Sequence, residues 1–391
     1  MSRYYSYLNS ATVILEQYDG TEPFSSFIKK YFSENKKYGS KDRKVIANLC
    51  FCYFRLGNAL QSIPIDEKIL AALFLCSSAP DKLLQALKPE WNERITISLN
   101  EKRDFLSWQF LDKDIFLWKE EISDAINKPD FIFSHLSQPD LFLRLRPGKN
   151  EIVVTKLDKE NISYTAISST CLSLPNASKV DKVIELNKEA VIQDYSSQRV
   201  EELLLPVKIN AHNPLMVWDC CAASGGKSLL AQDIFGKMDL TVSDIRESIV
   251  ANLKKRFAEA GIKKYKSLVA DLTKSVAGLL HQQFDLVIAD VPCSGSGTWG
   301  RTPEQLCYFS EKKISEYATL QRKIIDTITN HLKPGGHLLY ITCSVFKKEN
   351  EDQAAYIKQK FHLNEVKMEW LRGYDKKADT MFAVLFQKPL V

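Results

Sequence analysis

The spacing of apolar residues changes twice along the chain and divides it into three regions. In residues 1–136, apolar residues recur every three or four positions, as in LCFCYFRLGNAL (49–60) and EKILAALFLC (67–76). This is the period of amphipathic helices, so we predict an all-α domain. Residues 137–205 hold short alternating runs such as LFLRLRP (141–147), separated by Pro, Asn and Lys, which predict a small α+β linker subdomain.

From residue 206 to 391, strongly apolar runs alternate with amphipathic segments. Strands are predicted at LMVWD (215–219), LTVSD (240–244), SLVAD (267–271), FDLVIAD (284–290) and HLLYIT (337–342), with FAVLFQK (382–388) as a last, antiparallel strand. Helices are predicted over 226–236, 246–260, 273–282, 312–332 and 349–361. Runs that are apolar on both faces predict an α/β domain with a mainly parallel sheet, covered by helices on both sides.

Composition narrows the function classes only slightly. The chain of 391 residues is long enough for a proper core, and its nine cysteines form no CxxC pair and its six histidines no HxxxH, so no metal is expected. The odd cysteine count, the lack of a secretory h-region and the lack of a membrane-spanning run predict a cytoplasmic protein with reduced thiols. The net charge of +5 is compatible with a nucleic-acid partner without requiring one.

Basic residues gather near the first predicted helices. They are Lys29, Lys30, Lys36, Lys37, Lys41, Arg43 and Lys44. Exposed lysine is normal on helices, so a solvated face is favoured over an RNA-contacting patch.

Four predicted strands end in an aspartate: Asp219, Asp244, Asp271 and Asp290. The first is followed by CCAASGGKS (220–228), a turn of small residues that leads into a helix and lets backbone amides approach a ligand. A single strand-end aspartate is as often a helix N-cap as a ligand contact. Four of them around a glycine turn favour a binding site.

Two phosphate-binding motifs do not fit this turn. A Walker loop needs glycine where Cys221 stands, and the adjacent Gly225 and Gly226 do not make a GxGxxG fingerprint. A nucleoside without a polyphosphate fits better, with Asp244 accepting from ribose hydroxyls and Asp271 from an adenine amino group. S-adenosylmethionine has both groups, and its carboxylate suits the amides around Gly225.

Cys293 and Cys343 each follow a strand, at the sheet edge where α/β folds place their chemistry. Lys227 and Arg301 are candidate sources of the positive potential that activates a thiol. Methylation at carbon 5 of a pyrimidine needs a thiolate that adds to carbon 6 and a second group that removes the carbon 5 proton. Both cysteines are therefore candidate reactive thiols, whereas packing is favoured for Cys50, Cys52, Cys76, Cys171 and Cys307.

Three segments, residues 219–228, DVPCSGSGTWGRTPE (290–304) and PGGHLLYITCSVFKKENE (334–351), resemble the RNA cytosine-C5 methyltransferases of the RsmB/NOP2/NSUN type. VIQDYSSQ (191–198) and LFLRLRP are similar to the family's VQDxSSQ and LRxN segments, and KDRKVIANLCFCYFRLGNAL (41–60) is similar to a NusB-type RNA-binding domain. The resemblance implies a NusB-like domain over 1–136, a linker subdomain over 137–205 and a Rossmann-like class I methyltransferase domain over 206–391.

The resemblance also implies roles for individual residues. Cys343 would be the nucleophile, Cys293 would assist product release, and Asp290 would bind the cytosine edge with Lys227 nearby. The implied contacts to S-adenosylmethionine are Cys221, Ala222, Ala223, Ser224, Gly225, Gly226, Lys227, Asp244, Asp271 and Asp290.

The chain departs from the family pattern at several positions. Ser224 replaces a proline, Val291 an alanine, Gly300 an arginine and Arg146 an asparagine, and the tail reads DTMF (379–382) where DGFF is common. None of these changes removes a reactive group. The changes at Gly300 and in the tail bear on how RNA is held.

The expected function is methylation of an unpaired or flipped-out cytosine in RNA, with 16S rRNA favoured, by a monomer. Alternatives are the same chemistry on tRNA, a catalytically silent RNA-binding or ribosome-assembly factor, and a small-molecule methyltransferase. The intact Cys343, Cys293 and Asp290 disfavour a silent factor. Two strand-end thiols and a helical domain disfavour a small-molecule substrate.

Overall fold

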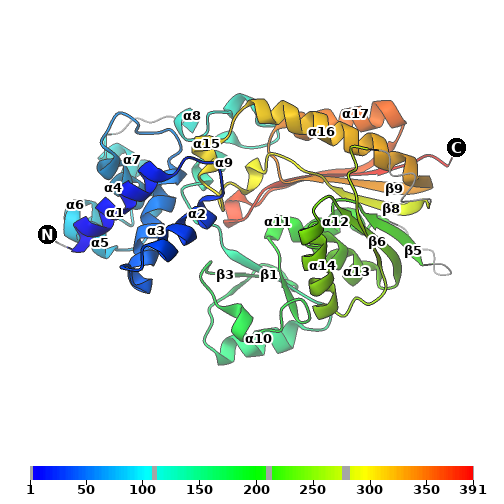
Figure 1. Cartoon of the computed structure of the whole chain (residues 1–391), viewed down its shortest axis with the longest axis horizontal. Helices are drawn as coiled ribbons and strands as arrows, with labels where there is room; N and C mark the ends of the chain where they lie inside the picture. Colours follow the sequence, from blue (N-terminus) through cyan, green and yellow to red (C-terminus); the bar gives the residue numbers. More distant parts are fainter. Residues whose placement is uncertain (1–2, 108–111, 208–213, 275–281, 391) are drawn as a thin grey trace. The chain divides into compact units, whose positions relative to one another are not determined.

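The computed structural model describes residues 3–107, 112–207, 214–274 and 282–390, and the chain forms two compact units. The helical unit comprises Met1–Ile122, Ile126–Gln138 and Thr298–Ser310, and the sheet unit comprises Ser123–Ala125, Pro139–Gly297 and Glu311–Val391 (Figure 1). The segment Thr298–Ser310 was not expected in the helical unit. Among the described residues, no helix is long and apolar enough to cross a bilayer.

The helical unit is all-α in its N-terminal part. Its helices are α1 (Arg3–Gln17), α2 (Phe24–Glu34), α3 (Ser40–Arg55), α4 (Ile65–Cys76), α5 (Lys82–Leu87), α6 (Pro89–Glu93), α7 (Leu99–Phe105), α8 (Asp112–Ile115) and α9 (Lys128–Ser134). The apolar run 49–60 is helical only as far as Arg55. The chain turns at Gly57, which has φ +53°. Only glycine fits there, because a Cβ would lie 2.2 Å from the carbonyl oxygen of Ile115.

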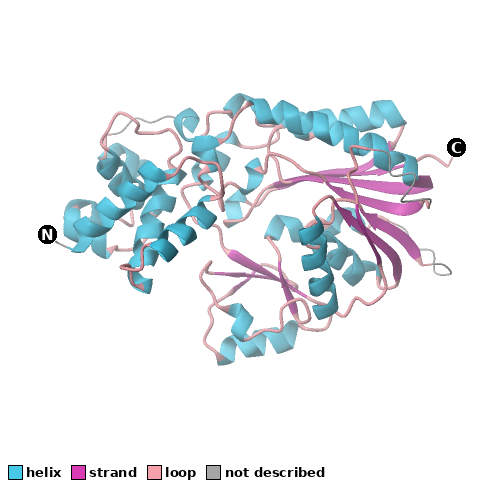
Figure 2. Cartoon of the chain, in the orientation of Figure 1, coloured by secondary structure: helices cyan, strands magenta, loops and turns pink. Residues whose placement is uncertain are grey.

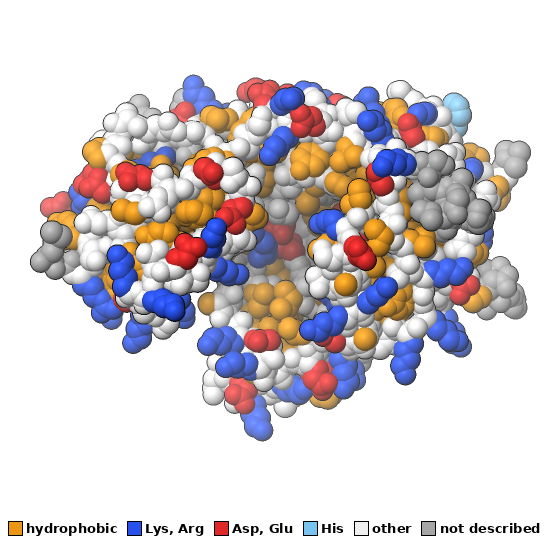
Figure 3. Space-filling model, viewed as in Figure 1, with side chains coloured by type: hydrophobic (Ala, Val, Ile, Leu, Met, Phe, Trp, Pro, Cys, Tyr) orange, Lys and Arg blue, Asp and Glu red, His pale blue; other side chains and the backbone are white. Residues whose placement is uncertain are grey.

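The basic residues of this unit lie on and between α2 and α3. Lys29, Lys30, Lys36, Lys37, Lys41 and Lys44 are exposed, whereas Arg43 is half-buried and donates to the carbonyl oxygen of Tyr38. Over the face shown in Figure 3, basic and acidic side chains are interspersed. The lysines predicted at the surface are therefore exposed.

The segment Thr298–Ser310, which contains α15 (Gln305–Tyr308), supplies part of the core of the helical unit. The ring of Trp299 is 1% exposed and its centroid lies 5.4 Å from those of Phe116 and Trp118. The side chain of Glu304 accepts a hydrogen bond from the backbone N–H of Phe24 at 3.2 Å. The helical unit is thus built partly from chain that begins five residues after Cys293.

The predicted linker region forms a four-stranded antiparallel sheet in the order β2-β3-β1-β4. The strands are β1 (Leu141–Leu145), β2 (Thr165–Ala166), β3 (Cys171–Leu174) and β4 (Ala190–Ile192), and α10 (Asn150–Lys159) packs on them through Val153 and Leu157. The short helices α11 (Tyr195–Gln198) and α12 (Glu201–Leu204) follow.

The larger sheet has seven strands in the order β10-β11-β9-β8-β5-β6-β7. Its strands are β5 (Leu215–Asp219), β6 (Met238–Asp244), β7 (Lys266–Val269), β8 (Phe284–Asp290), β9 (Leu332–Thr342), β10 (Asn364–Leu371) and β11 (Met381–Gln387). β7, β6, β5, β8 and β9 are parallel, and β11 and β10 are antiparallel. The chain order reverses between β5 and β8, and ligands of open α/β sheets bind beyond the carboxyl ends of strands at such a point.

Helices cover both faces of this sheet, as predicted (Figure 2). α13 (Gly226–Phe235) and α14 (Glu247–Glu259) share one core with Val217 and Leu286, whereas α16 (Lys312–Ile328) and α17 (Glu351–Phe361) share the other with Trp218 and Val287. Neighbouring residues of β5 and β8 thus point into opposite cores, which explains runs that are apolar at every position.

The strand predictions agree with the observed sheet except at one edge. The strand predicted at 382–388 is β11, the last strand of the chain and antiparallel to β9, but β10, which pairs with β11 and forms the edge, was not predicted. Most residues of β10 are exposed or half-buried, so its segment lacks a continuous apolar run. The helix predicted over 273–282 falls largely on residues 275–281, which lie outside the described residues.

Replacing Trp299 with alanine should lower the free energy of unfolding of the helical unit. Removing a fully buried tryptophan costs about 3–5 kcal/mol, because it leaves a cavity among Phe116, Trp118 and Phe309. Urea unfolding followed by tryptophan fluorescence and circular dichroism measures this loss. Stability unchanged from the wild type would show that the segment does not belong to the core.

Candidate active site

A cavity of about 480 Å³ opens at the carboxyl edge of the seven-stranded sheet. Of the residues singled out in the sequence, the cavity is lined by Cys221, Ala223, Asp244, Asp271, Asp290, Cys293 and Cys343. Its apolar wall includes Ile245, Leu272, Leu320 and Ile324, which the sequence did not single out. The structure thus brings the expected nucleoside contacts and both candidate thiols to one cavity.

The rest of the small-residue turn shapes the chain without lining the cavity. Gly225 has φ +82°, and a Cβ there would lie 2.5 Å from the ring of Phe257, so only glycine fits. Ser224 accepts a hydrogen bond at 2.9 Å from the guanidinium of Arg256. Ala222, Ser224, Gly225 and Gly226 do not line this cavity, and their contacts to S-adenosylmethionine stay a prediction.

Asp244 is an ionised acceptor at the cavity wall. It accepts hydrogen bonds from the backbone N–H of Ala223 at 3.0 Å and from the backbone and side chain of Arg246 at 2.9–3.0 Å. Burial favours its protonated form, but the hydrogen bonds from Arg246 outweigh burial and lower the pKa of Asp244. Sequence reasoning did not find Arg246, which lies two residues after the strand end and also lines the cavity.

The surroundings of Asp271 are compatible with both roles that the sequence left open for a strand-end aspartate, a local cap and a ligand contact. Its carboxylate accepts from the hydroxyl and the backbone N–H of Thr273 at 2.6 and 3.0 Å, and these bonds lower the pKa of Asp271. It therefore closes a local turn. It also lines the cavity, where a carboxylate oxygen can accept from a ligand.

Asp219 lies beneath the turn and away from the cavity lining. One carboxyl oxygen accepts from the hydroxyl of Ser228 at 2.6 Å, and the other has no hydrogen-bond partner among the described residues. Burial raises the pKa of Asp219 to about 7. Its observed contact therefore joins the end of β5 to the start of α13.

Lys227 is directed at Asp290. Its ammonium lies 2.9 Å from the carboxylate of Asp290 and donates at 2.9 Å to the hydroxyl of Ser197. Ser197 belongs to the segment 191–198, and Gln193 of the same segment also donates to this hydroxyl at 3.1 Å. The observed partner of Lys227 is thus a carboxylate and not a thiol. Arg301, the other candidate source of positive potential for the thiols, belongs to the helical unit.

The sulfur atoms of Cys293 and Cys343 are 3.3 Å apart, and both side chains are partly exposed. The contact with Cys343 and burial raise the pKa of Cys293 well above its usual range. Two thiolates at this distance would repel each other, so the pair carries at most one negative charge. All nine cysteines are free.

Two departures from the family pattern have structural partners. Arg146 pairs with Asp233 on α13 at 2.7 Å and also donates to the carbonyl oxygens of Asn187 and Ala260. In the tail, the backbone N–H of Thr380 donates to the carbonyl oxygen of Gly297 at 2.9 Å. The tail therefore contacts the loop that carries Cys293.

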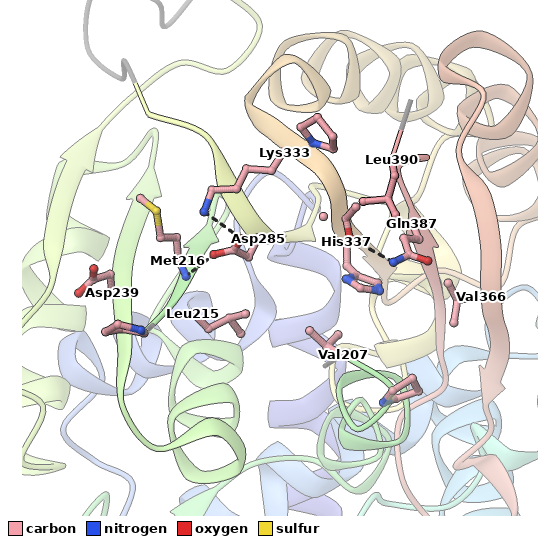
Figure 4. A pocket seen from close by; sticks show the side chains of 15 residues that line it. Val207, Leu215, Met216, Asp239, Asp285, Lys333, His337, Val366, Gln387 and Leu390 are labelled. Atoms are coloured by element: carbon pink, nitrogen blue, oxygen red, sulfur yellow. Dashed lines mark hydrogen bonds and ion pairs between the residues drawn. The ribbon is translucent and has the colours of Figure 1, made fainter. Parts of the chain in front are cut away.

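A second cavity, of about 810 Å³, lies at the opposite edge of the sheet (Figure 4). It is lined by the first residues of β5 and by Lys333 and His337 of β9, and Lys333 pairs with Asp285 at 2.9 Å. None of the predicted site residues lines it. Among the described residues, no group of three or more His, Cys, Asp or Glu side chains is placed to hold a metal ion.

The raised pKa of Asp219 should make stability fall with pH. The unfolded chain loses this proton near the ordinary pKa of about 4, whereas the folded protein loses it near 7, so the unfolded state binds fewer protons in between. The contribution of Asp219 to stability should therefore decrease from about pH 4 to about pH 7, and Asp219→Asn should remove this contribution. Urea unfolding across this range measures it, with the exposed Asp239→Asn as control. Equal slopes for wild type and Asp219→Asn would contradict the assignment.

Comparison with known proteins shows which family and fold the chain resembles. Residues 206–385 match the family model described as 16S rRNA methyltransferase RsmB/F. The ribosomal RNA small subunit methyltransferase B of Salmonella paratyphi A is 35% identical over 166 residues, which are 41% of this chain and 36% of that protein. The match thus spans about a third of that relative's length.

Two solved structures share the fold at low sequence identity. The crystal structure of PH0851 covers 99% of this chain and 100% of its own, with a TM-score of 0.70 and 19% identity. NSun6 from Pyrococcus horikoshii, solved with SFG, covers 70% of this chain and 97% of its own, with a TM-score of 0.59 and 13% identity. The predicted Rossmann-like class I methyltransferase fold is confirmed, and S-adenosylmethionine is the methyl donor of that class. Residues 206–385 are therefore similar to the methyltransferase domain that the RsmB/F family model describes.

Proposed function

We propose that the protein transfers the methyl group of S-adenosylmethionine to carbon 5 of a cytosine in RNA, with 16S rRNA as the first candidate substrate. The observation that carries the proposal is the pair of cysteine sulfurs 3.3 Å apart beside a cavity that also holds Asp244, Asp271 and Asp290. A small-molecule methyl acceptor would need no such pair of thiols. The name of the Salmonella relative supports a ribosomal RNA substrate.

Residues at the carboxyl ends of β5, β6 and β7 would hold the cofactor. The ionised Asp244 suits the ribose hydroxyls, and Asp271 with the apolar Leu272 and Ile245 suits an adenine ring. The guanidinium of Arg246 donates to both carboxylate oxygens of Asp244. When the cofactor binds, this guanidinium would move away or share the carboxylate with the ribose. When bound, S-adenosylmethionine supplies an electrophilic methyl group.

The two thiols would act in sequence. The thiolate of Cys343 adds to carbon 6 of the cytosine, which makes carbon 5 nucleophilic, and Asp290, paired with Lys227, binds the polar edge of the base. While Cys343 is a thiolate, Cys293 keeps its proton, because its pKa is raised by the contact with Cys343 and by burial. Once Cys343 is a neutral thioether, it no longer repels a negative charge on Cys293.

Cys293, whose side chain is partly exposed, can then give its proton to water and act as a base. It removes the proton from carbon 5 after methyl transfer, the carbon 5–carbon 6 double bond reforms, and Cys343 leaves as a thiolate. A base stacked in a duplex is out of reach, so the target cytosine has to be unpaired or flipped out. The exposed lysines of the helical unit suit phosphate contacts, which would make RNA binding salt-dependent.

Cysteine variants should separate the two roles. Cys343→Ala should abolish both methyl transfer and covalent binding, because nothing adds to carbon 6. Cys293→Ala should accumulate a covalent protein–RNA adduct, because the carbon 5 proton is not removed. Denaturing gel electrophoresis with labelled RNA detects the adduct. An adduct formed by Cys343→Ala and not by Cys293→Ala would reverse the assignment.

Bisulfite sequencing of total RNA, with and without the gene, tests the substrate. A cytosine of 16S rRNA should lose its mark when the gene is deleted and regain it with the wild-type gene. The Cys343→Ala gene serves as the matched control and should not restore the mark. Loss of a tRNA mark instead would favour the alternative substrate, and no change in any RNA would contradict the enzymatic function.

A further inference from the structure

Glu349 is a fully buried carboxylate that contacts both loops carrying the reactive thiols. It ends the short 3₁₀ turn Lys347–Glu349, just before α17, and its exposed fraction is 0%. The sequence placed it within the segment that resembles the family but assigned it no role. A buried carboxylate is costly unless hydrogen bonds satisfy it, so its partners indicate what it holds in place.

On one side Glu349 holds the loop of Cys293. Its Oε2 accepts from the backbone N–H of Ser294 at 2.8 Å and from the side-chain amide of Gln321 at 3.1 Å. The same amide of Gln321, on α16, donates to the carbonyl oxygen of Pro292 at 3.0 Å. The peptide groups on both sides of Cys293 are therefore bound by Glu349 and Gln321.

On the other side Glu349 holds the loop of Cys343. Its Oε1 accepts from the hydroxyl of Ser344 at 2.7 Å. This hydroxyl lies 3.1 Å from that of Ser294 and 3.2 Å from that of Ser296, and the backbone N–H of Gly297 donates to the carbonyl oxygen of Cys343 at 2.9 Å. The residues next to the two cysteines thus meet at one carboxylate.

We propose that Glu349, assisted by Gln321, is a positioning residue that keeps the two sulfur atoms in contact. The inference rests on the proposed function for its importance in catalysis, since attack by one thiol and release by the other need both at one cytosine. A displacement of about 1 Å at a reacting group can cost about 100-fold in rate, so a rigid link between the loops has a catalytic effect.

Positioning and proton transfer by Glu349 predict different behaviour for the amide variant. In Glu349→Gln, the amide oxygen can accept from Ser294 and Gln321, while its NH₂ donates to the hydroxyl of Ser344, which can turn toward Ser294 or Ser296. Glu349→Gln should therefore retain the link. Glu349→Ala should lose all three hydrogen bonds.

The rate of cross-linking by diamide reports how close the two thiols are, and it does not depend on methyl transfer. Two thiols lose two protons and two electrons, which reduce diamide to its hydrazine, and the sulfurs form a disulfide. Cross-linking between Cys293 and Cys343, quantified by peptide mass spectrometry, should slow by about tenfold or more in Glu349→Ala and stay within about threefold of wild type in Glu349→Gln. Methyl transfer to RNA should fall by about 100-fold in Glu349→Ala only.

Glu351→Gln is the matched control, because Glu351 lies two residues away and bonds to Ser123 and Trp370 instead. It should cross-link at the wild-type rate. Wild-type cross-linking in Glu349→Ala would overturn the proposal, and so would cross-linking in Glu349→Gln as slow as in Glu349→Ala.

If circular dichroism shows that Glu349→Ala does not fold, Gln321→Ala replaces it, since it cuts the link to Pro292 and one bond to Glu349. It should slow cross-linking by about threefold or more, and an unchanged rate would overturn the proposal. Cross-linking that follows these expectations in a protein with no methyl transfer would refute the proposed function and leave the role of Glu349 intact.

Discussion

Strands β8 and β9 pair in parallel with Asp290 opposite Ile341, and this register decides where both cysteines lie. The N–H of Val291 continues the pairing by donating to the carbonyl oxygen of Ile341 at 3.1 Å. Cys293 and Cys343 are 50 residues apart in sequence, yet each follows its strand by a few residues at the same sheet edge. A shift of register would separate the sulfurs and turn the core residues of both strands to the wrong face.

The loops beyond these strands lack sheet hydrogen bonds, so other groups have to hold them. Glu349, Gln321 and three serine hydroxyls form a buried polar cluster beneath the thiols, and Gly297 packs too closely against Thr380 and Cys343 for any side chain. Five residues after Cys293, the chain enters the core of the helical unit at Thr298. The polar cluster thus links the loop of Cys293 to the loop of Cys343, which suits thiols that have to meet a reacting base at a fixed distance.

Three strand-end aspartates show how position controls chemistry. Asp219 is buried, and its pKa is raised to about 7, whereas hydrogen bonds from Arg246 lower the pKa of Asp244. Asp290 pairs with Lys227 at the cavity that holds both thiols. The same residue type at equivalent strand ends is therefore a structural link at Asp219, a proposed ligand acceptor at Asp244 and a proposed substrate contact at Asp290.

The sequence alone determined the order of helices and strands in the methyltransferase domain, because apolar periodicity reflects burial on one or both faces. It also placed Asp244, Asp290, Cys293 and Cys343 at or just after strand ends, where parallel topology gathers side chains, and Asp271 lies two residues beyond β7. It missed β10, because this largely exposed edge strand has no continuous apolar run, although Val366, Met368 and Trp370 alternate with Lys367 and Glu369. Only the tertiary structure decided that Lys227 also donates to Ser197, that Trp299 belongs to the helical unit and that Glu349 joins the two thiol loops. Each of these depends on contacts between segments far apart in the chain, and local periodicity carries no information about such contacts.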